Sequence, residues 1–423
     1  MAGGKGTRIT NITSDIPKAM IPICGKPILE HQIECLKQNN ITDITLVIGH
    51  LGQHIKDYFD NGNKFGCNIS YYYETEPLGT AGALYKIKDL PENFILINGD
   101  IIFNLDFSRM ISFHNEKKAM ATLAVHPNDH PFDSALIISD QDMRVIKWMN
   151  KEDPRLYYKN MVNSGIHILS RELLTLIKPE KDKIDLDRDI LKPSIKDGGK
   201  IFAYLTPEYI KDMGTPERFS QVTEAIKKGI VSQKSLKNMQ RAVFLDRDGT
   251  INIEKGFISK HDDFELLDGA AQAIKEINHL GFLAIIITNQ PVIARGDTSL
   301  EELELIHNKM ETELGNNAAF IDDIYYCPHH TDKGFPGERP EYKIDCSCRK
   351  PKPGMILEAA NKYNIDLAKS YMVGDHKRDI EAGINAGCIP VFIGEEIDDN
   401  TMTYKSLLDF SRFLASIENK INK

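Results

Sequence analysis

The sequence AVFLDRDGTIN at residues 242–252 decides the fold of the C-terminal half of the chain. Four apolar or small residues run directly into Asp246 and Asp248, and a Gly-Thr turn follows. This pattern predicts a buried parallel strand that ends in two carboxylates at the rim of a sheet. The two side chains point to the same side of an extended chain, so Asp246 can attack phosphorus as a nucleophile while Asp248 protonates the leaving oxygen. The alternative is an ordinary strand end followed by an Asp-Gly turn.

Composition limits the classes of function. With 423 residues, the chain is long enough for two or three domains, and its 41% hydrophobic and 27% charged residues are typical of a soluble globular protein. The longest apolar runs, such as residues 282–287, are too short to span a membrane. The net charge of -9 without a basic patch argues against a nucleic-acid partner, and phosphorylated substrates would then require a bound cation such as Mg²⁺. Seven cysteines without a signal peptide predict a reducing, cytoplasmic location.

Short β-rich runs alternate with helical stretches in both halves, which predicts two doubly wound α/β domains with open, mostly parallel sheets. The expected strands are residues 41–48, 94–97, 121–125, 243–245, 283–288 and 371–373. The expected helices are residues 27–38, 107–114, 270–280 and 300–314. The Lys-rich, polar stretch at about residues 221–240 predicts a helix that runs into a linker. The expected division is therefore a first domain at 1–234, a linker at 235–240, a second domain at 241–395 and a helical tail at 396–423.

The N-terminal half opens with a glycine-rich loop, AGGKGTR at residues 2–8, whose backbone N–H groups can surround phosphates. Taken alone, this loop is equally well interpreted as a flexible terminus. Further motifs follow it in order: Pro17-Lys18-Ala19-Met20, Glu76 to Gly82, Asn98-Gly99-Asp100, Asn163-Ser164-Gly165 and Asp212 to Pro216. This set resembles the sugar-1-phosphate nucleotidyltransferases, and most closely the heptose- and mannose-1-phosphate guanylyltransferases.

The resemblance implies a Rossmann-like domain in which a sugar-1-phosphate oxygen attacks the α-phosphorus of a nucleoside triphosphate, with GTP the expected nucleotide. It implies that Asp100 and Asp212 hold Mg²⁺ and that Arg8 and Lys18 contact phosphates. The remaining implied ligands are Gly3 and Gly4 in the phosphate loop, Gly79 and Thr80 near the base and sugar, Lys151 at the sugar phosphate, and Asn163 and Gly165 at the sugar. The sequence has Asn150-Lys151-Glu152 where the family usually has Glu-Lys-Pro.

The opening Asp pair resembles the first motif of the haloacid dehalogenase-like phosphatases, and the other motifs of that family follow in order. The resemblance implies that Thr288 hydrogen-bonds the transferring phosphoryl group and that Lys350 neutralises it and pairs with Asp246. It also implies an aspartyl-phosphate mechanism with Mg²⁺ held by Asp246, Asp248 and Asp375. Alternatively, the same carboxylates could cap helices.

Two pairs of metal-ligand residues lie about twenty residues apart: Cys327 with His329, and Cys346 with Cys348. Three thiolates and one imidazole suit tetrahedral Zn²⁺, and a site without an open position is structural. Free buried cysteines are the alternative, and His330 is a competing ligand.

The cysteine-rich loop, residues 327–348, makes the resemblance more specific. Residues 241–395 look like the D-glycero-D-manno-heptose 1,7-bisphosphate 7-phosphatases, and the histidinol-phosphate phosphatases are the nearest alternative. The resemblance implies substrate contacts from Asn289, and Arg295 and Arg349 are candidates for the second phosphate because a guanidinium binds phosphate bidentately. Pro291-Val292 replaces the usual Ser-Gly after Thr-Asn-Gln.

Together the two halves predict a bifunctional enzyme: removal of the 7-phosphate leaves heptose 1-phosphate, which the N-terminal half would convert to GDP-heptose for surface polysaccharide. One rival hypothesis makes the N-terminal half an inactive sugar-nucleotide sensor, and another changes the substrates. A last expectation concerns Met1. Only two residues precede Gly3, where an open α/β domain has a buried first strand, so the reading frame is expected to continue upstream into an apolar segment.

Overall fold

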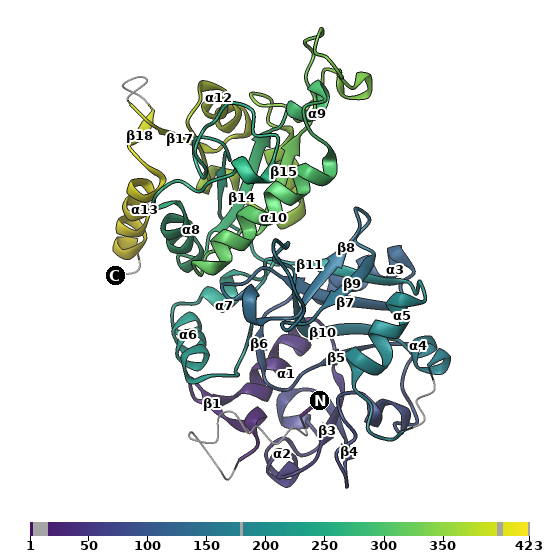
Figure 1. Cartoon of the computed structure of the whole chain (residues 1–423). Coiled ribbons are helices and arrows are strands. Elements are labelled where there is room, and N and C mark those ends of the chain that lie inside the picture. The colour runs from purple at the N-terminus through teal and green to yellow at the C-terminus, as the bar shows by residue number, and fades with distance from the viewer. Residues whose placement is uncertain (3–15, 178–180, 396–400, 422–423) are drawn as a thin grey trace. The chain divides into compact units, whose positions relative to one another are not determined.

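The computed structural model describes residues 1–2, 16–177, 181–395 and 401–421 (Figure 1). The chain divides into two compact units. The first contains Met1–His126, Ile137–Met149 and Asn163–Ser235, and the second contains Pro127–Leu136, Asn150–Val162 and Leu236–Lys423. The two short segments before residue 163 that group with the second unit lie inside the range that the sequence assigned to the first domain.

The main sheet of the first unit is mixed. Its strand order is β11-β7-β10-β8-β9, and β5 also pairs with β10. The pair β7–β11 is parallel, whereas β10 is antiparallel to both β5 and β8. The expectation of a mostly parallel sheet is therefore wrong for this unit, although its α/β class is confirmed. The strands are β5 (Asn93–Ile97), β7 (Ala121–His126), β8 (Leu136–Ser139), β9 (Val145–Met149), β10 (Val162–Ser170) and β11 (Ile201–Leu205).

Three two-stranded sheets complete the strands described in this unit. They are the parallel pair β3 (Asp43–Ile48) and β4 (Asn68–Tyr73), and the antiparallel pairs β6 (Ile101–Phe103) with β12 (Ile210–Asp212) and β1 (Pro22–Ile23) with β2 (Lys26–Pro27). Met1 and Ala2 contact strands of different sheets: the Met1 amine donates to the carbonyl of Ile97 at 2.8 Å, and the Ala2 N–H donates to that of Val47 at 2.9 Å.

Two helices of the first unit, α1 and α6, begin at residues that suit helix starts. Pro27 precedes α1, and Thr215 accepts a hydrogen bond from the Arg218 N–H at the start of α6, where Pro216 is the first helical residue. The helices are α1 (Ile28–Gln38), α2 (Gly52–Phe59), α3 (Phe107–Lys117), α4 (Arg171–Leu176), α5 (Lys192–Lys196), α6 (Pro216–Lys227) and α7 (Ile230–Gln233), and Leu186–Leu191 form a π-helix.

The second unit has one parallel sheet in the order β15-β14-β13-β16-β17-β18. All residues of the central strand β13 are fully buried, which explains the uninterrupted apolar run at its position in the sequence. The strands are β13 (Ala242–Leu245), β14 (Leu283–Asn289), β15 (Asp323–Cys327), β16 (Tyr371–Gly374), β17 (Ile389–Ile393) and β18 (Met402–Tyr404).

Side chains of β13 alternate between two hydrophobic cores, one on each face of the sheet. Val243 and Leu245 pack with residues of α8, α10 and α13, whereas Phe244 packs with residues of α11 and α12. The unit is therefore doubly wound, as predicted. Its helices are α8 (Ala270–His279), α9 (Val292–Arg295), α10 (Leu300–Asn316), α11 (Gly354–Tyr363), α12 (Lys377–Ala386) and α13 (Leu407–Ile421).

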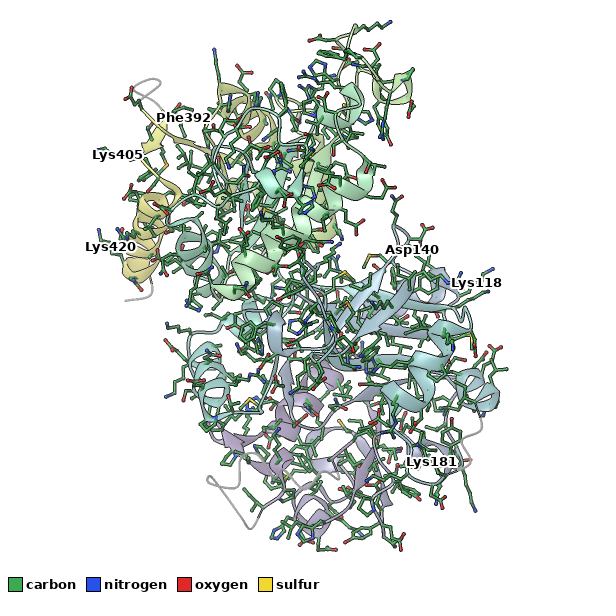
Figure 2. The ribbon with its side chains drawn as sticks, viewed as in Figure 1. Lys118, Asp140, Lys181, Phe392, Lys405 and Lys420 are labelled. Carbon is green, nitrogen blue, oxygen red and sulfur yellow. The ribbon has the colours of Figure 1, made fainter. Side chains whose placement is uncertain are left out.

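The C-terminal segment is part of this unit, and not only a helical tail. Strand β18 extends the sheet beside β17, and Phe410 and Leu414 of α13 are fully buried in the core of the unit. Figure 2 labels Phe392 in β17, Lys405 after β18 and Lys420 in α13. The sequence analysis missed β18 because its three residues, Met-Thr-Tyr, are too few to show a period of two. None of the helices described here is long and apolar enough to cross a membrane.

Candidate active sites

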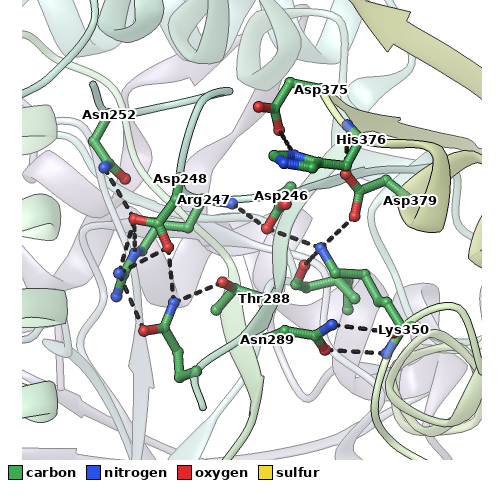
Figure 3. Close-up of polar contacts among 12 residues, drawn as sticks. Asp246, Arg247, Asp248, Asn252, Thr288, Asn289, Lys350, Asp375, His376 and Asp379 are labelled. Atoms are coloured by element: carbon green, nitrogen blue, oxygen red, sulfur yellow. Dashed lines mark hydrogen bonds and ion pairs between the residues drawn. The ribbon is translucent and has the colours of Figure 1, made fainter. Parts of the chain in front are cut away.

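The first candidate site lies at the carboxyl end of the parallel sheet, where the neighbouring strands β14, β13 and β16 end. Figure 3 shows the polar contacts among its residues. Parallel strands bring the residues that follow them to one edge of the sheet, which is where open α/β folds bind their ligands. Asp246 follows β13, Thr288 lies near the end of β14, and Asp375 follows β16. The fold thus brings together three residues that are far apart in the sequence.

Lys350 joins two carboxylates at the centre of this site. Its Nζ lies 2.8 Å from Asp246 Oδ1 and 2.7 Å from Asp379 Oδ1, and it donates to the carbonyl of Ile287 at 2.7 Å. Burial and then the charge of Asp379 raise the pKa of Asp246 to about 6, although Lys350 opposes this shift. Burial alone would lower the pKa of Lys350, but the two carboxylates raise it, so the ammonium stays charged.

Asp379 has no assigned role in the sequence analysis, yet it is fully buried beside Lys350. It is also the third residue of α12, where its Oδ2 accepts the His376 N–H at 3.0 Å in a capping box. The signal in the sequence was its position one helical turn beyond Asp375. That spacing alone did not reveal that the carboxylate turns toward Lys350.

Asp248 is held by nitrogen donors on both of its oxygens. Arg247 and Asn252 donate to Oδ1, while Arg247 and Gln290 donate to Oδ2, at distances from 2.9 to 3.2 Å. Burial alone would raise the pKa of Asp248, but the charge of Arg247 and these hydrogen bonds lower it. Although Asp246 and Asp248 are only two residues apart, their surroundings raise the pKa of the first and lower the pKa of the second.

Thr288 and Asn289 contribute in different ways. The Thr288 hydroxyl, almost fully buried, accepts the Gln290 amide at 2.9 Å. The Asn289 side chain bonds the backbone of Lys350 twice, accepting its N–H at 3.0 Å and donating to its carbonyl at 3.1 Å. Asn289 was predicted to contact substrate, and the contacts that the structure gives it hold the Lys350 loop against the end of β14.

The carboxylates fit a magnesium ion. Ligand atoms of Asp246, Asp375, His376 and Asp379 all lie within 4.8 Å of one another, and carboxylate oxygens are the ligands that Mg²⁺ prefers. Gly249 has a φ of +77°, and a Cβ added there would lie 2.0 Å from Asp375 Oδ2. Only glycine therefore leaves the space that this carboxylate occupies. Burial raises the pKa of Asp375, a cost that a bound cation would relieve.

The four predicted zinc ligands also converge. The Sγ atoms of Cys327, Cys346 and Cys348 lie 3.2 to 3.5 Å apart, and His329 Nδ1 lies 3.3 Å from Cys348 Sγ. Burial raises the pKa of the Cys327 thiol. His330 instead pairs with Asp332 at 3.6 Å. Three sulfurs and one imidazole nitrogen match the donor set and number of a structural Zn²⁺ site.

The two arginines proposed for a second phosphate have protein partners. The guanidinium carbon of Arg295 lies over the rings of Phe257 and Phe335, 4.0 and 4.3 Å from their centroids, and its Nε is 3.2 Å from Asp297 Oδ2. Arg349 donates to the carbonyl of His329 at 3.1 Å and is thereby attached to the cysteine-rich loop.

The second candidate site is in the first unit, where β6 and β12 pair antiparallel so that Asp212 lies opposite Ile101. The Met213 N–H donates to the Asp100 carbonyl at 2.9 Å, so the two predicted metal carboxylates are held at neighbouring positions. Lys18 Nζ lies 2.6 Å from Asp100, and Arg218 donates to both oxygens of Asp212 at 2.8 Å. The sequence analysis did not identify Arg218; its position in the first turn of α6, six residues after Asp212, was the available signal.

The other residues predicted for this site belong to several different segments of the chain. A Cβ on Gly79 would lie 2.3 Å from the Ile184 carbonyl, and the Thr80 hydroxyl accepts the Leu186 N–H at 2.8 Å, so both hold the loop that precedes the π-helix. Asn163 and Gly165 lie in β10. Four further predicted residues remain: Lys151 is exposed and 3.8 Å from Glu152, whereas Gly3, Gly4 and Arg8 lie outside the described residues.

These two sites define an α/β chain that joins a nucleotidyltransferase to a phosphatase. Residues 1–229, more than half of the chain, match the nucleotidyl transferase family, and the chain belongs to it. Residues 347–407 match the HAD-hydrolase-like family. The chain also belongs, through its C-terminal half, to the family of the D-glycero-beta-D-manno-heptose-1,7-bisphosphate 7-phosphatases, as two relatives show.

The relative from Pasteurella multocida is 44% identical over 149 residues, which cover 35% of this chain and 78% of that protein. The relative from Vibrio cholerae is 38% identical over 185 residues, which cover 42% of this chain and 97% of that protein. Among solved structures, HddC from Yersinia pseudotuberculosis is 29% identical, with a TM-score of 0.47, and covers 53% of this chain and 96% of that protein. The nucleotidyl transferase family match and the two phosphatase relatives show that the chain is an enzyme with a nucleotidyltransferase half and a phosphatase half.

Proposed function

We propose that this enzyme removes the 7-phosphate of D-glycero-D-manno-heptose 1,7-bisphosphate and then transfers a nucleotidyl group, GMP from GTP, to the heptose 1-phosphate that remains. The observation that carries the proposal is the buried Asp246–Lys350–Asp379 cluster beside Asp248, in a half that belongs to the heptose bisphosphate phosphatase family. The product of that half is the type of substrate that a sugar-1-phosphate nucleotidyltransferase half would consume.

The positions of these groups support the following phosphatase reaction. Asp246 attacks the 7-phosphorus, the bond from phosphorus to the sugar oxygen breaks, and that oxygen takes a proton from Asp248. Water then attacks the aspartyl phosphate and loses a proton to Asp248, which releases phosphate and restores Asp246. Lys350 and the Thr288 hydroxyl hold the phosphoryl group, and Asn289 fixes the Lys350 loop. The oxygens of Asp248 already accept hydrogen bonds from Arg247, Asn252 and Gln290, which disfavours direct metal binding through this side chain.

In the nucleotidyltransferase half, a heptose 1-phosphate oxygen attacks the α-phosphorus of the nucleotide, and pyrophosphate leaves. This reaction needs positioning and charge neutralisation and no covalent intermediate. Lys18 lies 2.6 Å from Asp100, so both side chains can act on the same phosphate groups of the substrates, and Arg218 orients Asp212. Arg8, Gly3 and Gly4 are proposed to surround the nucleotide phosphates, with Gly79 and Thr80 near the base and Lys151, Asn163 and Gly165 near the sugar.

Two metals fit the described residues. Mg²⁺ bound by Asp246 and Asp375, and in the other half by Asp100 and Asp212, would neutralise phosphate charge. Zn²⁺ bound by Cys327, His329, Cys346 and Cys348 would tie the cysteine-rich loop and take no part in bond cleavage. Thiolate ligands remain reduced in the cytoplasm, the location that we propose.

The test measures phosphate release from heptose 1,7-bisphosphate and from histidinol phosphate with the full chain. We expect the heptose substrate to give a kcat/KM at least about tenfold higher, a difference of about 1.4 kcal/mol in the transition state. A screen of GTP, ATP, UTP and CTP with heptose 1-phosphate then measures pyrophosphate release, and GTP should lead. A preference for histidinol phosphate would contradict the proposed substrate. Absence of pyrophosphate with every nucleotide would favour an inactive sensor in the N-terminal half.

A further inference from the structure

Arg247 lies between the two aspartates of the opening motif, and its side chain is fully buried. A buried guanidinium cannot lose its charge by deprotonation, so the surrounding structure must neutralise it. Asp248 provides this partner: Arg247 Nη2 donates to Oδ1 and Oδ2, both at 2.9 Å, and Nε donates to Oδ1 at 3.2 Å (Figure 3).

Two other elements hold the same guanidinium. Its Nη1 lies 3.3 Å from Nε2 of His307 in α10, and because arginine has no acceptor, this nitrogen accepts and the ring proton lies on Nδ1. Its Nη2 donates to Gln290 Oε1 at 3.2 Å, just after β14. The Gln290 amide in turn donates to Asp248 and to Thr288, both at 2.9 Å. Through Arg247 and Gln290, Asp248 is therefore connected by hydrogen bonds to α10 and to the end of β14, two elements that follow it in the chain.

We propose that Arg247 is a positioning residue of the phosphatase reaction, which together with Gln290 holds the Asp248 carboxyl in the orientation that protonates the leaving oxygen. The inference rests on the proposed acid role of Asp248. As the bond between phosphorus and the sugar oxygen breaks, a proton passes from Asp248 to that oxygen, and the carboxylate left behind faces the charge of Arg247. Without this network Asp248 keeps its place in the chain but can rotate away from the leaving group.

The leaving group separates this role from a purely structural one. A sugar alkoxide needs a proton as it departs, whereas p-nitrophenolate departs as a stable anion. Arg247→Lys keeps a positive charge but loses the planar fork that grips both oxygens of Asp248. We expect it to lower kcat for heptose 1,7-bisphosphate by about 100-fold, with little change in KM, and kcat for p-nitrophenyl phosphate by less than about threefold.

A double variant tests whether Arg247 acts through Asp248. If it does, Arg247→Lys in an Asp248→Asn background should cost no more than about twofold beyond Asp248→Asn alone, because residues that act as a unit are not additive. Arg241→Lys is the matched control. Arg241 pairs with Glu418 at 2.6 Å and stacks on Phe282 at 4.2 Å, away from the described site residues, so both substrates should react at the wild-type rate.

Gln290→Met provides a second variant if Arg247→Lys does not fold, as judged by thermal melting. It removes the other donor to Asp248 Oδ2, and about a tenfold loss with the same dependence on the leaving group is expected. Equal losses with both substrates, or losses that multiply in the double variant, would overturn the positioning role. If the wild-type enzyme does not turn over p-nitrophenyl phosphate, the double variant decides alone. If it releases no phosphate from heptose 1,7-bisphosphate either, the proposed function fails instead.

Discussion

The two candidate sites differ most in how deeply their charged groups are buried. The Asp246 side chain is 4% exposed and that of Lys350 is 0% exposed, whereas the side chains of Asp100 and Asp212 are 41% and 40% exposed. A covalent nucleophile must meet phosphorus in one orientation, which a buried, doubly paired cluster provides. Carboxylates that hold a metal between the phosphates of two substrates need open space before the substrates bind. The burial of each site thus agrees with the role proposed for it.

The largest expected effect tests whether this difference corresponds to two separate activities. Asp246→Asn removes the nucleophile and should lower phosphate release by about 10⁴-fold or more. It should leave pyrophosphate release from supplied heptose 1-phosphate and GTP unchanged. The reciprocal Asp100→Asn variant should show the opposite pattern. Loss of both activities in either variant, if it is still folded, would mean that the sites do not work independently.

Metal content tests the cysteine-rich loop next. Cys346→Ser removes one of four converging ligands, so the purified variant should retain less zinc and unfold at a lower temperature, with a stability loss of several kcal/mol. Elemental analysis and thermal melting measure the two effects. Cys24→Ser, at an exposed cysteine outside the cluster, is the matched control and should change neither. Active wild-type protein that contains no zinc would eliminate the metal from this loop.

Asp379 tests whether the second partner of Lys350 contributes to catalysis. Asp379→Asn removes a charge that lies 2.7 Å from the ammonium, and the helix cap to His376 weakens with it. We expect kcat for phosphate release to fall by roughly 10- to 100-fold, because Lys350 is then free to move from the position that neutralises the phosphoryl group. The pyrophosphate assay serves as the internal control. Wild-type phosphate release would show that Asp246 alone fixes the lysine.

The smallest expected effect concerns acid stability in the first unit. Burial lowers the pKa of His167 in β10 from 6.5 to about 4, so the unfolded state binds more protons between these values. Stability is therefore fully present above about pH 6.5 and is lost as the pH falls toward 4, by about 2 kcal/mol at pH 5. His167→Phe should flatten this part of the urea-midpoint profile, whereas His54→Gln, at an exposed position, should not. An unchanged slope in His167→Phe would assign the loss to other groups.

The sequence by itself determined the elements that depend on local patterns. The apolar run before Asp246 predicted β13, and helical periodicity predicted α1, α3, α8 and α10 within a few residues of their bounds. The paired spacing of cysteines and histidine indicated a four-ligand cluster, and the structure brings those four side chains together. These patterns can be read directly because burial repeats with the period of the element, and because ligand pairs two residues apart are neighbours in any fold.

The tertiary structure alone decided which distant groups pair. The sequence did not reveal that Lys350 lies between two carboxylates, that Asn289 binds its backbone across 61 positions, or that Gln290 reaches Asp248 across 42. It also did not reveal that the first unit has a mixed sheet or that β18 joins the edge of the second sheet. Such pairings depend on strand order and on the packing of whole layers, which no local period encodes. The local pattern supplied the reactive groups, and the order of β13, β14 and β16 brought them to one edge.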